Sequence, residues 1–249
     1  MMKKFVMVLA VCIMFAAEGI AAEKTISIAT SEWLPYCGRF LANYGIEPEI
    51  VAAAYQRMGY NTDFNFMAWS RAIKEVKEGK YDAVTSASFT QERARDYLYS
   101  KSHMDSPAVF YKRKGSPITW SVLEDLKPYK IGVIKDYSYS PEFDKADFLQ
   151  KVASKNEVLA LKKLILKQAD LIVMDRFVGH YTISEKLTAY EKNIPEILYP
   201  PLYLDKLHLM VSKKTPDALK KLEAFNAGLK KIIKDGTLKS ILVKHGLGK

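Results

Sequence analysis

The segment DAVTSASFTQER, residues 82–93, places small hydroxyl side chains where an apolar run ends and adds one arginine after the turn. Ser86 and Ser88 are two residues apart, so on a regular strand they share a face and can present both hydroxyls to one ligand. Arg93 falls in the first turn of a helix that Thr90 is expected to cap, where free backbone N–H groups favour an anion. A guanidinium there can bind a carboxylate through two hydrogen bonds. The segment therefore predicts a carboxylate site.

Other polar and aromatic side chains fall at the ends of further predicted strands. Asp175 ends the apolar run ADLIVMD, and an ionised carboxylate that only accepts hydrogen bonds suits an ammonium. Trp33 and Trp69 could cover the apolar body of a small molecule or stack on a cation. The remaining candidates at strand ends are Glu32, Arg71 and Ser138. Together these residues describe a clamp for a zwitterion.

Each of these side chains also has an ordinary structural explanation. Serines at a strand end often cap the local backbone, an arginine after a turn often forms a surface ion pair, and an aspartate before a helix often caps it. Their joint placement favours the functional interpretation, because ligands of open parallel α/β sheets bind beyond the carboxyl ends of the strands.

The elements that would position these residues form two α/β units. In the first unit, crossover helices between short strands predict a parallel sheet in β-α-β-α-β order. Its expected elements are a strand at 25–30, a helix at 47–59, a strand at 62–67, a helix at 70–79 capped by Ser70, and a strand at 81–88. The second unit repeats the plan with strands at 108–117, 129–134 and 169–175 and helices at 156–168 and 176–187. One more strand and amphipathic helices complete the chain, which predicts two lobes.

Four stretches resemble bacterial solute-binding protein family 3, the periplasmic amino-acid-binding proteins of ABC transporters. They are GKYDAVTSASFTQERARDYLYS, LEDLKPYKIGVIKDYSYS, QADLIVMD and KKIIKDGTLKSILVKHGL, in the order and spacing that the family uses. The resemblance covers nearly the whole mature chain. It implies an α/β, two-lobe periplasmic-binding-protein (type II) fold with a two-strand hinge that closes on an amino acid.

The resemblance also implies residue roles and boundaries. Arg93 would bind the ligand α-carboxylate, with Ser86 or Ser88 and, from the far lobe, Ser138 as hydroxyl partners. Asp175 would bind the ammonium, and Trp33 and Trp69 would stack on the ligand. Residues 23–104 and 207–249 would form lobe 1, residues 109–200 lobe 2, and residues 105–108 and 201–206 the hinge.

The N-terminus is typical of a secretory signal peptide at residues 1–22. Lys3 and Lys4 precede an apolar run, and small residues follow at the expected cleavage site. We expect a soluble, exported, periplasmic protein in which only Cys37 remains, so no internal disulfide can form. The formal net charge of the full chain is +10. Because its lysines are spread along helical faces, we expect these faces to be solvated and to bind no nucleic acid.

Two other function classes remain open. Some proteins of this fold are dehydratases, and Glu32 beside Trp33 could be an acid with a raised pKa. A sensory module that signals to a membrane receptor would need the same loaded form as a transport component. The sequence has no Gly-rich phosphate loop, and its four histidines lack metal-ligand spacing, so we expect no cofactor and no metal. The expected partners of a monomer are a small-molecule ligand and an ABC transporter permease.

Overall fold

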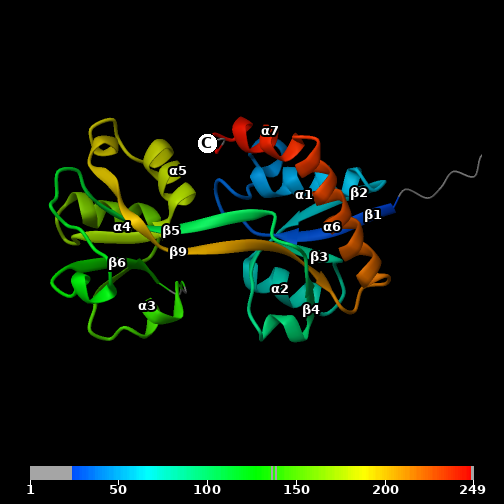
Figure 1. The fold of residues 1–249 in the computed structure, drawn as a ribbon, viewed down its shortest axis with the longest axis horizontal. Helices are drawn as coiled ribbons and strands as arrows, with labels where there is room; N and C mark the ends of the chain where they lie inside the picture. Colours follow the sequence, from blue (N-terminus) through cyan, green and yellow to red (C-terminus); the bar gives the residue numbers. More distant parts are fainter. Residues whose placement is uncertain (1–23, 136, 138, 248–249) are drawn as a thin grey trace, which may run out of the picture.

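The computed structural model describes residues 24–135, 137 and 139–247, and the expected signal segment 1–22 lies outside them. The chain forms two α/β lobes joined by two long strands (Figure 1). No helix within the described ranges is both long and apolar enough to cross a membrane.

The first lobe contains the β-α-β-α-β unit expected from the sequence. Its elements are β1 (Lys24–Thr30), α1 (Ile46–Gln56), β2 (Tyr60–Phe66), α2 (Trp69–Lys77) and β3 (Ala83–Ser88). Strand β1 pairs in parallel with both β2 and β3, so the predicted parallel sheet is confirmed. Two helices from the end of the chain, α6 (Ala218–Lys234) and α7 (Thr237–Lys244), pack against α1. Gly228 of α6 permits this contact, because a Cβ there would lie 1.9 Å from the Ala54 carbonyl oxygen of α1.

The second lobe repeats the plan with a smaller sheet. Its strands are β6 (Lys130–Ile134), β7 (Gln150–Ser154) and β8 (Leu171–Asp175), and β6 pairs in parallel with the other two. Its helices are α3 (Pro141–Lys145), α4 (Glu157–Ile165) and α5 (Arg176–Lys186). The last of these begins directly at the end of β8, which fixes Asp175 at the junction.

Strands β5 (Met104–Arg113) and β9 (Pro195–Ser212) run antiparallel from one lobe to the other (Figure 1). In the second lobe β5 also pairs with β8, and in the first lobe β9 pairs with β3 and with β4 (Tyr97–Tyr99). The sheet order is β2-β1-β3-β9-β5-β8-β6-β7. The segments expected as the hinge, 105–108 and 201–206, lie in this pair, and the exact lobe boundaries stay a prediction.

Each lobe has its own buried apolar clusters. In lobe 1, Ile28 and Ile50 pack with Phe225 and Ile232 of α6. In lobe 2, one cluster lies around α4 and another around Phe110 and Phe143. The start of α5 is an exception, because Val178 is buried in the lobe 1 cluster. The two lobes therefore touch beside Asp175.

Three local expectations differ from the structure. Helix α2 begins at Trp69 with Ala68 at its N-cap, so the prediction that Ser70 caps it is wrong. The helix starts earlier because Trp69 and Ile73, one turn apart, both pack on the core. Strand β5 begins at Met104 rather than at residue 108, because it pairs with β9 before it reaches lobe 2. The helix expected at Arg93 is a single three-residue 3₁₀ turn, Arg93–Arg95.

Candidate functional site

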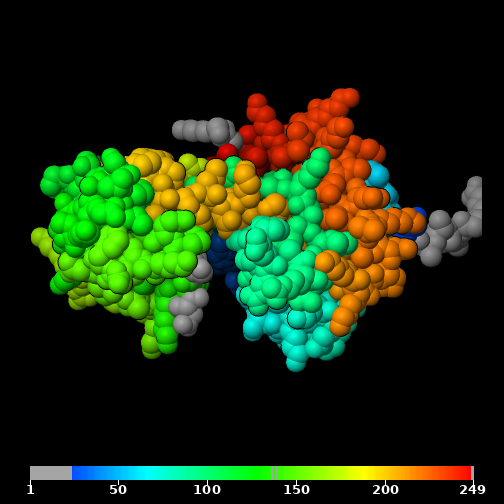
Figure 2. All heavy atoms as spheres, turned by 60° about the horizontal axis from the view of Figure 1, so that its bottom comes forward, coloured from blue at the N-terminus to red at the C-terminus, as the bar shows by residue number. Residues whose placement is uncertain are grey.

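The molecule is hollowed between the two lobes (Figure 2). In this view the green atoms of lobe 2 and the cyan atoms of lobe 1 stand on opposite sides, and dark-blue atoms from the start of the described chain are visible between them. Strands β1, β3 and β8 belong to parallel pairs whose carboxyl ends carry the predicted site residues.

Arg93 of lobe 1 is held by short-range contacts. Its backbone N–H donates to Thr90 Oγ1 at 3.1 Å, so the predicted Thr90 bond is present even though the helix is only one turn. Its Nη1 donates to the Ser88 carbonyl oxygen at 3.3 Å, and its guanidinium lies 5.6 Å from the centre of the Trp69 ring. No carboxylate in the described part of the chain pairs with it. This half-buried cation is therefore able to bind an anion.

A β-bulge gives Ser86 and Ser88 different partners. Ser86 has a left-handed φ of 65°, and the pairing of β3 with β9 shifts between Val84 and Ala87. The Ser86 hydroxyl bonds to the Glu47 carboxylate, and the Ser88 hydroxyl bonds to Asp205 of β9. The regular alternation behind the expectation of a shared face is therefore absent, and that expectation is wrong.

Glu47 lies at the centre of a buried polar network under this bulge. Its side chain, in the first turn of α1, is fully buried, and its Oε1 lies 2.8 Å from Nε2 of the equally buried His103. Cys37 Sγ lies 3.1 Å from Ser86 Oγ and 3.7 Å from Glu47 Oε2. Burial, with the nearby Glu47 charge, raises the pKa of the Cys37 thiol. The thiol therefore stays protonated and acts as a packed donor in this network.

Asp175 caps α5 and accepts four hydrogen bonds. Its Oδ1 accepts from the backbone N–H groups of Phe177 at 2.8 Å and Val178 at 2.9 Å. Its Oδ2 accepts from Ser106 Oγ at 2.7 Å and from the Tyr36 hydroxyl at 2.9 Å. Burial raises the pKa of Asp175, and the four donors offset only part of that rise. The capping role expected as the ordinary explanation is thus present.

A chain of contacts connects Arg93 to Asp175 through the two hinge strands. Arg93 donates to the Ser88 backbone, and the Ser88 hydroxyl bonds to Asp205. Asp205 is paired opposite Ser106 in the β5–β9 ladder, and Ser106 donates to Asp175. Three hydrogen bonds and one backbone pairing therefore link the predicted cation to the predicted anion.

Aromatic rings line the Asp175 end of this region. Trp33 stacks on Tyr36 with ring centres 4.2 Å apart and planes inclined by 22°. The rings of Tyr36 and Phe177 of α5 form a T-shaped pair, with ring centres 6.0 Å apart and planes inclined by 79°. Trp69 accompanies Arg93 instead, so the two predicted tryptophans lie beside opposite charges of the site.

The other predicted residues take part less directly. Glu32 is exposed and pairs with Arg39 at 2.7 Å. Arg71 has 66% of its side chain exposed and pairs with Glu75 at 2.8 Å, one helical turn away. Ser138 lies outside the described residues. No group of His, Cys, Asp and Glu suited to a metal ion occurs in the part of the chain that is described.

Sequence reasoning missed Tyr36, Ser106, Asp205 and Glu47. Tyr36 follows the first strand exit closely enough to have been a candidate, and Ser106 and Asp205 fall in the two expected hinge segments. Polar residues within a predicted hinge are a signal that could have found the last two. Glu47 carries no such signal, since an acidic residue in the first turn of a helix is ordinary.

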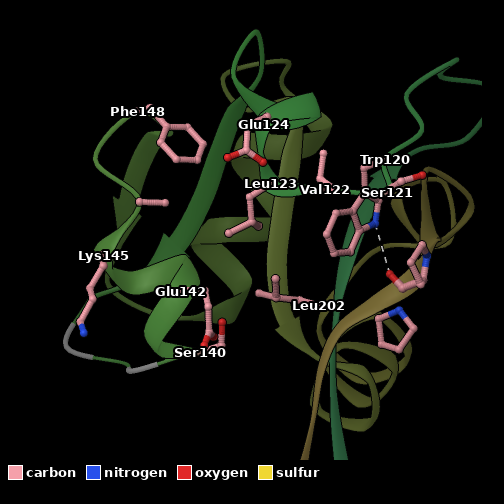
Figure 3. Close-up of a pocket in the computed structure, with 13 residues that line it drawn as sticks. Trp120, Ser121, Val122, Leu123, Glu124, Ser140, Glu142, Lys145, Phe148 and Leu202 are labelled. Atoms are coloured by element: carbon pink, nitrogen blue, oxygen red, sulfur yellow. Dashed lines mark hydrogen bonds between the residues drawn. The ribbon is translucent and has the colours of Figure 1, made fainter.

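Two further hollows are present, and the second of them borders this region at Phe177. One of about 700 Å³ is on lobe 2, between the segment at Trp120, helix α3 and the prolines of β9, where Trp120 Nε1 donates to the Pro200 carbonyl oxygen (Figure 3). Another, of about 500 Å³, lies between the hinge strands, the start of α5 and α7. None of the eight described candidate residues lines either hollow.

Comparison with known structures supports the same architecture. The chain is similar to a substrate binding protein of an amino acid ABC transporter, with a TM-score of 0.66 and 20% identity over 88% of this chain and 98% of that one. A histidine kinase sensor domain with similarity to periplasmic binding proteins gives a TM-score of 0.69 and 24% identity, covering 89% and 96%. An ancestral amino acid-binding protein, a precursor of cyclohexadienyl dehydratase, gives a TM-score of 0.64 and 21% identity over 88% of this chain and 94% of that one. At these identities the likeness shows the fold alone.

No curated protein matches the sequence. The family described as bacterial extracellular solute-binding proteins, family 3, matches residues 27–248, which is almost the whole described chain. Two α/β lobes, a two-strand connection and polar residues at the strand exits agree with that match. The chain therefore belongs to the bacterial extracellular solute-binding proteins, family 3.

Proposed function

We propose that this protein captures a small zwitterionic solute, a polar amino acid, between its two lobes in the periplasm and delivers it to the permease of an ABC transporter. The observation that carries this proposal is the contact chain from Arg93 through Ser88, Asp205 and Ser106 to Asp175. It ties a cation without a carboxylate partner in the described chain to an anion at the start of α5. One ligand with both charges suits such a region.

In this proposal Arg93 binds the ligand carboxylate. A guanidinium offers two parallel N–H donors to a carboxylate, and Trp69 restricts where it can lie. Ser86 and Ser88 contribute through the backbone of the bulge, because their hydroxyls already bond to acids. Asp175 binds the ammonium, and Trp33 covers the ligand from lobe 1. Ser138 stays a predicted contact from lobe 2.

The rest of the proposal concerns partners and location. Residues 1–22 are removed on export, and the mature protein acts as a monomer. We do not assign Glu32 an acid's role in catalysis, because its carboxylate is exposed and bonded to Arg39. The Arg71 ion pair is equally exposed, so neither residue is central to the proposed ligand contact.

A thermal-shift screen tests the proposal. The mature protein is mixed with L-amino acids, polyamines and small carboxylates, and the melting temperature is followed. A ligand that binds the folded state alone raises this temperature, and we expect the largest rise with a polar amino acid.

Two matched variants make the screen specific. Arg93→Ala should abolish the rise, whereas Arg95→Ala, an exposed arginine in the same turn, should keep it. A rise caused by polyamines alone would contradict the proposed ligand class. Recovery of a chemically altered ligand after incubation would contradict a binding function.

A further inference from the structure

Tyr36 is held rigidly by lobe 1. The backbones of Trp33 and Cys37 exchange two hydrogen bonds of 2.9 Å around it, and its own carbonyl oxygen accepts from the Glu47 N–H at 3.1 Å. The side chain is fully buried, stacked on Trp33 and in contact with Phe177. Its hydroxyl therefore has a position fixed by the surrounding backbone and rings.

That hydroxyl reaches across to a carboxylate in the other lobe. Asp175 Oδ2 accepts from Tyr36 and from Ser106, while Oδ1 accepts from two backbone N–H groups of α5. A carboxylate has about four lone-pair positions, so all of them are filled. An ammonium can bind Asp175 only if one of the four donors leaves.

The four donors differ in how easily they can leave. The two backbone N–H groups belong to the first turn of α5 and would be left unpaired. Ser106 moves with Asp175, because β5 pairs with β8 and sets Ala108 opposite Asp175. Tyr36 alone comes from the opposite lobe, so it is the donor that a separation of the lobes withdraws, whereas Ser106 lies on β5 two residues from the position paired with Asp175.

We propose that Tyr36 determines how strongly the site prefers amines, because its hydroxyl occupies the position on Asp175 that a ligand ammonium needs. This inference rests on the proposed function. A charge-assisted bond from an ammonium is stronger than a bond from a neutral hydroxyl, so an amine displaces Tyr36. A ligand without an amine leaves the Tyr36 bond intact and so leaves Asp175 fully bonded. Tyr36 thereby lowers the affinity of the site for amines and leaves its affinity for their deaminated analogues unchanged.

The Tyr36 contact also joins the two lobes directly. Tyr36 touches both Asp175 and Phe177, and Val178 of the same helix is buried among lobe 1 residues. Loss of the hydroxyl should therefore loosen the ligand-free protein. Binding of an amine exchanges this direct contact for one that passes through the ligand.

The test uses Tyr36→Phe, with Tyr55→Phe as its matched control. Both tyrosines are fully buried in lobe 1 and each donates one hydroxyl bond, but the bond of Tyr55 goes to the Lys221 carbonyl oxygen. Calorimetry on the full mature chain compares L-glutamate with glutarate and L-arginine with δ-guanidinovalerate, which differ in the α-amine alone. X-ray scattering of the ligand-free proteins measures the radius of gyration.

We expect Tyr36→Phe to raise the affinity ratio of amine to deaminated probe by about tenfold, the value of one hydrogen bond to a charged group. We expect its ligand-free radius of gyration to exceed that of the unaltered protein. Tyr55→Phe should lower the melting temperature with no change in the ratio or the radius.

Three results would overturn the inference. An unchanged or lower ratio in Tyr36→Phe, with a melting temperature reduced as in Tyr55→Phe, would give Tyr36 a structural role alone. A larger radius with an unchanged ratio would mean a contact between lobes that does not compete with ligand. If no probe binds the unaltered protein but the radius increases, the proposed function fails for these ligands, and the amine preference fails with it.

Discussion

The two ends of the proposed site differ in how completely their charges are already bonded. Arg93 is supported by one carbonyl oxygen and one aromatic ring, and no carboxylate among the described residues pairs with it. Asp175 accepts four hydrogen bonds, two from the start of a helix and two from side chains. A ligand carboxylate can therefore simply add to the arginine end, whereas a ligand ammonium must exchange with an existing donor at the aspartate end.

This difference shows that opposite charges in one site can act in different ways. The arginine end gains its full interaction on binding, because nothing in the described chain has to be given up. The aspartate end gains only the difference in free energy between the hydrogen bond from the ligand ammonium and the hydrogen bond that it replaces. Affinity should depend mainly on Arg93, and selectivity should depend mainly on Asp175 and its donors.

The largest expected effect is therefore at Arg93. Arg93→Ala leaves a desolvated ligand carboxylate unpaired, at a cost of about 2 to 5 kcal/mol, and should weaken binding by roughly thirtyfold or more. Arg93→Lys should recover only part of this loss, because an ammonium cannot reproduce the planar fork. Calorimetry measures both, with Arg95→Ala as the control. If Arg93→Ala kept full affinity, Arg93 would not bind the ligand, and the contrast between the arginine and aspartate ends of the site would be wrong.

A smaller effect is expected when the charge of Asp175 is removed. Asp175→Asn keeps a good helix cap, so the fold should be retained while the ammonium loses its counter-charge. The preference for an amine over its deaminated analogue should fall by about tenfold, and the affinity for the analogue should change little.

A second cap separates ligand recognition from helix capping. Asn156 caps α4 in lobe 2 by accepting from the Leu159 N–H, so Asn156→Ala should lower stability and leave the preference unchanged. Titration of each variant with the paired ligands gives the result. An equal loss of preference in both variants would reduce Asp175 to a capping residue.

The pH dependence should also differ between the two ends. Burial raises the pKa of Asp175, and only the ionised carboxylate attracts an ammonium. Amine affinity should therefore fall several-fold on acidification, beginning above the usual aspartate pKa of about 4. The contribution of Asp175 to the free energy of unfolding changes in the opposite direction. Because its folded pKa exceeds its unfolded pKa, this contribution falls as the pH rises from the unfolded pKa to the folded one.

Calorimetry from about pH 7 to pH 4 checks this dependence. Once the titration of each ligand's own carboxyl groups is subtracted, the loss should disappear in Asp175→Asn, and a deaminated ligand should lack it in the unaltered protein. Identical pH profiles for amine and analogue would place the titrating group elsewhere.

The smallest effects are expected at the exposed ion pairs. Glu32→Gln and Arg71→Ala each remove one surface pair, of a kind that contributes little, so the affinity should change less than about twofold. Mass spectrometry of the ligand after long incubation provides the functional check. A dehydrated or hydrolysed product that disappears in Glu32→Gln would replace the binding function with an enzymatic one.

Much of the fold followed from periodicity, whereas the bonding at the site did not. Alternating strands and helices predicted the parallel pairing of β1 with β2 and β3 and of β6 with β8, and Asp175 at the end of an apolar run was correctly placed before a helix. Strand β7 was not expected, and the strand expected at 108–117 pairs antiparallel with β8 as part of β5. The bulge at Ser86 has no such pattern, because a serine rarely adopts a left-handed φ and the sequence gives no sign of it. The Tyr36 bond joins residues 139 positions apart, a distance that local spacing does not reach.

The path of the chain between the lobes has a consequence for the order of synthesis. Lobe 2 is built from one continuous stretch between β5 and β9, so all its strands emerge together. Lobe 1 begins with β1 but takes Phe225, Leu229 and Ile232 of its core from α6 and Ile241 from α7. The half made first is thus completed last: α1 packs on the early strands, but α1 itself must await α6 and α7 before its contacts with them can form.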